Sequence, residues 1–98
     1  MKEFDCVEVI VEKARYAKEG IHKGMQGWIC DPRNIDGYWL VNFPQCGEKQ
    51  DIATLDVKEE DLKLIPAMQA TVNEQIQAAV DGPKDISGYI IILSVSDV

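Results

Sequence analysis

The chain has 98 residues, of which 46% are hydrophobic and 28% are charged. A chain of this size can bury one hydrophobic core but not two, so residues 1–98 are predicted to form a single domain. The 10 Lys and Arg residues against 17 Asp and Glu residues give a formal net charge of -7. This balance disfavours nucleic acid as a partner, because cationic side chains supply most of the affinity for phosphate backbones. A basic protein partner suits the chain better.

The cysteines and the N-terminal residues favour a reducing compartment. Cys6, Cys30 and Cys46 form an odd set without C-x-x-C spacing, which is typical neither of a disulfide framework nor of a zinc site. The N-terminus has no apolar stretch of the kind found in signal peptides, and no segment approaches the roughly 20 apolar residues that span a membrane. We therefore expect a cytoplasmic protein without cofactor or metal.

The first part of the chain carries the alternation typical of β-strands. Apolar side chains alternate with mostly polar ones from Val7 to Val11, which predicts the first strand. A long polar loop over residues 13–23 follows. A turn at residues 31–37 then joins strands over residues 28–30 and 38–43 as a hairpin. The alternation in the last of these strands places three side chains in the core: Trp39, Val41 and Phe43.

Two further short strands are predicted over residues 52–55 and 62–65. The segment between them, residues 56–61, is interpreted as a single helical turn with acidic residues near its start, where the helix dipole favours them. Five short strands with one long first loop indicate a small, strongly bent barrel rather than a sandwich.

The order of these elements resembles that of a known group of folds. Residues 5–65 are similar to a small SH3-like barrel of the bacterial kind, and the Gly24-x-x-Gly27-x-Ile29 element resembles the turn and second strand of KOW-type barrels. The resemblance implies a barrel that binds proteins or nucleic acid, or that serves as an accessory domain of an enzyme.

The last third of the chain has a different pattern. Apolar residues recur at spacings of three and four over residues 67–80, which predicts an amphipathic helix, and Asp81-Gly82-Pro83 is expected to end it. A final strand is predicted over residues 87–95. The predicted fold class is mainly β: a five-stranded SH3-like barrel over residues 5–65, with a helix and a strand over residues 66–98 packed on it.

The final strand is apolar on both faces, so another part of a protein must cover it. It can add to the barrel edge beside the first strand, or it can pair with its copy in a homodimer. The chain is therefore expected to be a monomer, or a homodimer through the C-terminal strand.

Trp28 and Tyr38 are predicted to lie on the outer face of the barrel. The apolar stripe of the helix over residues 67–80 is one plausible cover for them. The alternative is that both rings stay exposed as a partner-binding aromatic patch, because Trp and Tyr dominate binding hot spots.

No catalytic motif stands out. His22 is the only histidine and lies in the predicted loop, and no serine lies in a G-x-S-x-G element, so the protein is expected not to be an enzyme. One charged cluster remains, with two interpretations: a solvated helical turn, or an acidic docking surface for a basic partner. Its five carboxylates are Asp51, Asp56, Glu59, Glu60 and Asp61.

These features suggest a non-enzymatic protein-binding module. Its most concrete form is an immunity-type protein, which neutralises a basic toxin through an acidic face. The alternative is an accessory SH3-like domain that associates with a metabolic enzyme through Trp28 and Tyr38. Neither form involves nucleic acid or a membrane.

Overall fold

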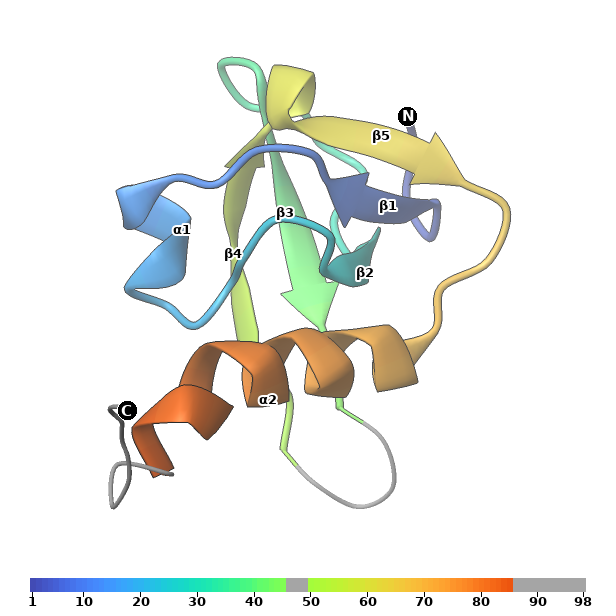
Figure 1. The fold of residues 1–98 in the computed structure, drawn as a ribbon. Coiled ribbons are helices and arrows are strands. Elements are labelled where there is room, and N and C mark those ends of the chain that lie inside the picture. Colours follow the sequence, from blue (N-terminus) through green and yellow to red (C-terminus); the bar gives the residue numbers. More distant parts are fainter. Residues whose placement is uncertain (46–49, 86–98) are drawn as a thin grey trace.

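The computed structural model describes residues 1–45 and 50–85, and the fold is mainly β, as predicted (Figure 1). One antiparallel sheet contains five strands in the order β4-β3-β2-β1-β5. The strands are β1 (Cys6–Val9), β2 (Gln26–Ile29), β3 (Tyr38–Phe43), β4 (Ala53–Lys58) and β5 (Leu62–Ile65). The helical elements are α1 (Ala14–Ala17), the 3₁₀ turn η1 (Glu59–Asp61) and α2 (Ala70–Asp85).

The topology leaves two strand edges at the ends of the sheet. Strands β2, β3 and β4 pair in chain order, and β5 returns to pair with the far side of β1. In Figure 1, β1 and β5 run across the direction of β3 and β4, so the sheet is strongly curved. Because β1 has a partner on each side, no further strand can add beside it, which corrects one of the two placements expected for the C-terminal strand. That strand itself, residues 87–95, lies outside the described residues.

The bounds of two strands differ from the prediction, because contacts with other parts of the chain set where these strands end. Strand β4 continues to Lys58, whose Cα pairs with that of Tyr38, so the helical turn is shorter than predicted and begins only at Glu59. Strand β1 ends at Val9, and the next amide, that of Ile10, donates to the Asp61 carbonyl at 2.9 Å. Local propensity is a weak guide where cross-strand hydrogen bonds are available.

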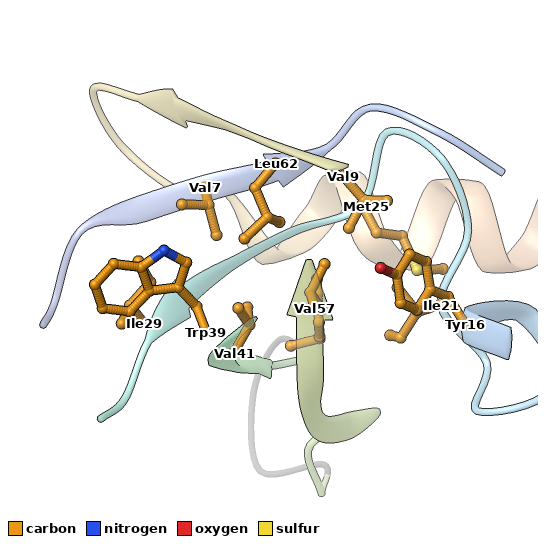
Figure 2. Close-up of a cluster of buried hydrophobic side chains, with 11 residues drawn as sticks. Val7, Val9, Tyr16, Ile21, Met25, Ile29, Trp39, Val41, Val57 and Leu62 are labelled. Atoms are coloured by element: carbon orange, nitrogen blue, oxygen red, sulfur yellow. The ribbon is translucent and has the colours of Figure 1, made fainter. Parts of the chain in front are cut away.

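The core lies inside the curved sheet. The three predicted core residues of β3 are buried, which confirms the predicted alternation. Figure 2 shows Tyr16 and Ile21 beside Met25 at one end of the cluster and Trp39 with Ile29 at the other. Tyr16 and Ile21 come from the segment that was predicted to be a polar loop. This segment instead contains α1 and folds over the interior, so it contributes to the core.

The two glycines of the Gly24-x-x-Gly27 element are needed for different geometric reasons. Gly24 has a φ of +93°, in the left-handed region that side chains disfavour, and its amide donates to the Val9 carbonyl at 2.8 Å. Gly27 lies against β3, and a Cβ at this position would be 2.3 Å from the Asn42 carbonyl oxygen. The first glycine therefore serves the turn into β2, and the second lets two strands approach closely.

Helix α2 is attached to the sheet by a buried amide. The Asn73 side chain is fully buried and accepts a hydrogen bond from the Gln26 amide at 2.6 Å. Its Nδ2 donates to the carbonyls of Gln26 at 2.7 Å and Pro44 at 3.0 Å. Ile76 packs against the core cluster. Helix α2 therefore packs on the sheet through Asn73 and Ile76.

The end of α2 differs from the prediction. The helix starts at Ala70 and runs to Asp85, across the Gly82-Pro83 pair that was expected to end it. Pro83 lies in the last turn, where the missing N–H costs one backbone hydrogen bond while the preceding turns keep theirs. Among residues 1–45 and 50–85, no helix is long and apolar enough to cross a membrane.

Candidate protein-binding surface

The predicted acidic cluster divides into exposed and buried carboxylates. Asp51, Asp56, Glu59 and Glu60 are exposed, whereas Asp61 is only 3% exposed. Asp61 is therefore a structural group of the interior, and the exposed acidic surface does not contain it. The three residues of η1 thus point in different directions, as the tight 3₁₀ geometry of about three residues per turn requires.

Asp61 is the centre of a partly buried polar network. Its Oδ2 accepts hydrogen bonds from Lys13 Nζ and from the Tyr16 hydroxyl, both at 2.7 Å. The same Tyr16 oxygen accepts the Lys58 amide at 3.1 Å. Burial alone would raise the pKa of Asp61, but the bonds from Lys13 and Tyr16 outweigh it and hold this pKa below its ordinary value. Burial and the bond to Asp61 raise the pKa of Tyr16. The network ties α1 to η1.

Glu59 and Glu60, together called the acidic rim, border an open hollow of about 620 Å³. Glu59 is held in place: its Oε1 accepts from Trp39 Nε1 at 2.7 Å and from Asn34 Nδ2 at 3.3 Å. The Glu60 side chain is 70% exposed, and its carboxylate lies 3.7 Å from Lys58 Nζ. The hollow is lined by Met1, Asn34, Gly37, Trp39, Lys58, Glu59, Glu60 and Leu62.

The other two exposed carboxylates have their own neighbours. Asp51 accepts from Asn42 Nδ2 at 2.8 Å. Asp56 lines a second open groove, of about 750 Å³, on whose edge its backbone carbonyl accepts from the Arg15 guanidinium at 2.7 Å. Neither residue lines the hollow of the acidic rim. Among the described residues, the five predicted carboxylates therefore do not form one site.

Tyr38 belongs to the second groove, which we call the α1–β4 groove. Its ring faces the Arg15 guanidinium, whose Cζ lies 5.3 Å from the ring centroid and 4.7 Å from that of Tyr16. Asp31 and Arg33, also in the lining, form a charged pair with contacts of 2.6 and 2.9 Å. These hydrogen bonds from Arg33 lower the pKa of Asp31 to about 2. The groove thus combines aromatic surface with charged side chains, of which Asp31 and Arg33 pair with each other.

Trp28 lies apart from Tyr38. It lines neither the α1–β4 groove nor the hollow at the acidic rim. Its indole is half-buried and stacks on Phe4, with ring centroids 6.0 Å apart and an interplanar angle of 26°. Phe4 is 69% exposed and has a φ of +72°, a backbone conformation that a bulky side chain rarely adopts. The two aromatic residues singled out from the sequence therefore belong to different surfaces.

The remaining titratable groups do not converge on a reactive centre. His22 Nδ1 lies 2.8 Å from Glu12 Oε2. Cys6 and Cys30 are half-buried free thiols, and burial is the main cause that raises the pKa of Cys30. Cys46 lies outside the described residues. Within the part of the chain that the structure describes, no group of three or more His, Cys, Asp or Glu residues could hold a metal ion.

Sequence reasoning did not identify Lys13, Tyr16 and Asn34, which position the carboxylates of η1. For Tyr16 a signal existed, because a large aromatic residue in an otherwise polar segment favours burial. Lys13 and Asn34 offer no comparable signal, since both are common surface residues.

No family model, curated protein or solved structure matches this chain. The resemblance to SH3-like and KOW-type barrels therefore stays a prediction.

Proposed function

We propose that the protein is a non-enzymatic binding module that presents the acidic rim to a basic protein partner. The observation that carries this proposal is the fixed position of Glu59, whose carboxylate is held by the Trp39 indole and the Asn34 amide at the border of an open hollow. In the most concrete form, the module is an immunity-type protein, and the partner is a toxin whose cationic site the rim covers.

Two physical arguments support a basic partner. A carboxylate that is already held in place loses little side-chain entropy on binding, so more of its interaction energy contributes to affinity. The net charge of -7 attracts a cationic partner from a distance and raises its association rate, an effect that falls as salt increases. Glu60, with its highly exposed side chain, adds a second charge at the same rim.

The test compares two charge variants that differ only in position. The chain is immobilised and exposed to lysate from its source as wild type, as Glu59→Lys/Glu60→Lys, and as the control Glu3→Lys/Glu19→Lys. Each pair of substitutions adds four charges to -7, giving -3. We expect the wild type and the control to retain a basic protein that the rim variant loses. Purified partner should then bind the rim variant at least about tenfold more weakly, about 1.4 kcal/mol.

Two results would contradict the proposal. Equal loss of the partner from both charge variants would show that net charge, and not the rim, governs binding. Full retention by the rim variant would place the binding site elsewhere. Circular dichroism of all three proteins checks that each is folded, so that loss of binding is not loss of structure.

A second candidate function is favoured by the stacked Phe4–Trp28 pair. An exposed aromatic ring in an unfavourable backbone conformation suits a binding contact, since such strain is found at functional sites. In that case the protein is an accessory domain of a larger enzyme assembly. Trp28→Ala would then abolish capture of the partner while Glu59→Lys/Glu60→Lys retains it, which is the reverse of the pattern expected for the acidic rim.

A further inference from the structure

The two edges of the sheet differ in how their backbone groups are bonded. At the β4 edge, the Asp56 carbonyl accepts from the Arg15 guanidinium at 2.7 Å, and the Lys58 amide donates to the Tyr16 hydroxyl at 3.1 Å. Side chains of α1 therefore occupy backbone groups of this edge. Because an unprotected edge strand is a template for pairing with another chain, α1 restricts such pairing at β4.

At the β5 edge, the ladder with β1 decides which backbone groups face outward. The Ile10 amide donates to the Asp61 carbonyl at 2.9 Å, directly beyond the last register pair of the two strands. Hydrogen-bonded pairs recur at every second residue of an antiparallel ladder. Lys63 therefore faces β1, whereas Leu62 and Leu64 direct their backbone groups away from it.

Three of these outward backbone groups are open. The Leu62 amide donates to the Glu59 carbonyl at the end of η1. The Leu62 carbonyl and both backbone groups of Leu64 have no hydrogen-bond partner among residues 1–45 and 50–85. Leu64 is 56% exposed, so its side chain offers apolar contact beside the open groups. Figure 1 shows β5 on the far side of the sheet from α2. Side chains of α1 thus protect β4, while β5 stays open.

The open edge begins at the acidic rim. The turn η1 runs directly into β5, and Leu62, the first residue of β5, lines the same hollow as Glu59 and Glu60. Lys63, the cation of this strand, already lies 3.6 Å from a carboxylate oxygen of Glu8. A segment extended along β5 therefore meets the rim carboxylates next to the open backbone groups. A basic residue at the end of the segment nearest η1 is the complementary one.

We propose that β5 receives an extended, basic segment of the partner as an additional strand, the mode of recognition called β-strand addition. The pairing of its basic residue with the acidic rim rests on the proposed function. The backbone of the segment bonds to the Leu62 carbonyl and to the amide and carbonyl of Leu64, and an apolar side chain packs on Leu64. Main-chain hydrogen bonds supply affinity in this mode, and the side-chain contacts supply selectivity.

A second copy of the chain fits the edge less well. Each copy has a net charge of -7, so two copies repel each other. In one antiparallel register, Leu62 pairs with Leu64 of the copy, and the two Lys63 side chains lie directly opposite each other, which is destabilising. In the register centred on Leu64, Leu62 lies opposite Pro66, which has no N–H to donate.

Amide hydrogen exchange of the full-length protein, followed by NMR with a synthetic peptide, tests the proposal. The probe is acetyl-Lys-Thr-Val-Thr-Val-Thr-Lys-amide, and its acidic counterpart has Glu in place of each Lys. We expect the Leu64 amide to exchange fast in the free protein and at least about tenfold more slowly with the basic peptide in excess. The acidic peptide should leave this amide fast.

A substitution at the edge tests the role of the backbone itself. Leu64→Pro removes the outward amide without removing a bond to β1, since proline is tolerated in edge strands where the N–H faces solvent. We expect this variant to bind the basic peptide at least about tenfold more weakly than the wild type. The matched control Leu64→Val keeps the amide and an apolar side chain and should bind like the wild type. Slow exchange of the Val41 amide in every variant checks that the sheet is intact.

Three results would overturn the proposal. Slow exchange of the Leu64 amide in the free monomer would show that another part of the chain covers the edge. Equal binding of the basic and acidic peptides would show that the edge does not select a basic segment. Protection without peptide that appears only at protein concentrations where light scattering finds a dimer would assign the edge to a second copy.

Capture from lysate separates this proposal from the function of the acidic rim. If Leu64→Pro retains the basic protein that Glu59→Lys/Glu60→Lys loses, the rim binds its partner without strand addition, and only the assignment of the β5 edge fails. If both variants retain that protein, both proposals fail.

Discussion

The two sides of η1 show how differently adjacent carboxylates behave in one short segment. On the outer side, Glu59 and Glu60 are exposed at the border of a hollow; on the inner side, Asp61 is buried and accepts two hydrogen bonds. In the sequence the three residues form one uniform acidic run. The charge of such a run therefore gives only its composition. The direction of each side chain decides whether its carboxylate faces solvent or the interior.

A buried carboxylate is stable only when its neighbours replace the water that it loses. Asp61 gains a cation from Lys13 and a hydroxyl donor from Tyr16, residues that are 48 and 45 positions away in the chain. Glu59 has neutral donors at the surface instead. The inner carboxylate should therefore govern stability, and the outer pair should govern binding.

Replacing Asp61 is the strongest test of this division. In Asp61→Ala, the buried Tyr16 hydroxyl loses its acceptor, and Lys13, whose side chain is 43% exposed, loses its counter-charge. Leaving a buried donor without a partner costs about 1 to 3 kcal/mol, and we expect a loss near the upper value in the free energy of unfolding measured with urea. Glu60→Ala is the matched control and should change it by less than about 0.5 kcal/mol. Equal losses of unfolding free energy in Asp61→Ala and Glu60→Ala would show that the inner and outer carboxylates contribute alike to stability.

The pH dependence of stability should identify Asp61 as well. Its pKa in the folded protein lies below the ordinary value, which is about 3.9 for an unfolded chain. Its stabilising contribution is therefore complete above about pH 4 and is lost as the pH falls through the folded pKa. We expect the wild type to lose more stability than Asp61→Asn between about pH 4 and the folded pKa in thermal unfolding. Parallel curves would mean that other carboxylates control the acid transition.

The sequence predicts those parts of the fold that repeat with a regular period. Alternation predicts the burial of Trp39, Val41 and Phe43, and three-four spacing predicts α2, because both patterns depend on one buried face. The extension of β4 through Asp56 to Lys58 could not be predicted, since acidic residues disfavour strands and only the register with β3 imposes one. The same holds for the end of α2 beyond Pro83.

Only the residue types of the candidate site could be predicted from the sequence, and not their arrangement. The sequence identifies Glu59 and Glu60 as acidic residues near a turn, but their difference from Asp61 depends on Lys13, Tyr16, Asn34 and Trp39, which other elements bring to η1. Side-chain contacts between residues 20 or more positions apart leave no local pattern, so a single sequence gives no indication of them.

Removing one hydroxyl should have an intermediate effect. Tyr16→Phe keeps the ring in the core but leaves Asp61 with Lys13 alone and the Lys58 amide without its acceptor. A hydrogen bond to a charged group contributes about 1.5 to 3 kcal/mol, so we expect a loss near the lower value in urea unfolding. Tyr38→Phe, which also removes one hydroxyl, is the control and should change stability little. A Tyr16→Phe loss as large as that of Asp61→Ala would mean that Lys13 contributes nothing.

The smallest change in stability is expected at the acidic rim. In Glu60→Gln only one exposed charge disappears, together with a 3.7 Å pair with Lys58 whose side chains are 43% and 70% exposed; such surface pairs contribute about 0 to 1 kcal/mol. Unfolding should therefore change by less than about 0.5 kcal/mol. Binding of the basic partner should weaken about two- to fivefold, mostly through slower association, and the difference from wild type should shrink in high salt. The control Glu19→Gln has the same net charge as Glu60→Gln. It should bind the basic partner like the wild type in a surface plasmon resonance assay at both low and high salt. If Glu60→Gln instead destabilises the fold while binding normally, its carboxylate serves the interior as Asp61 does, and the two sides of η1 do not differ in the way that their exposure indicates.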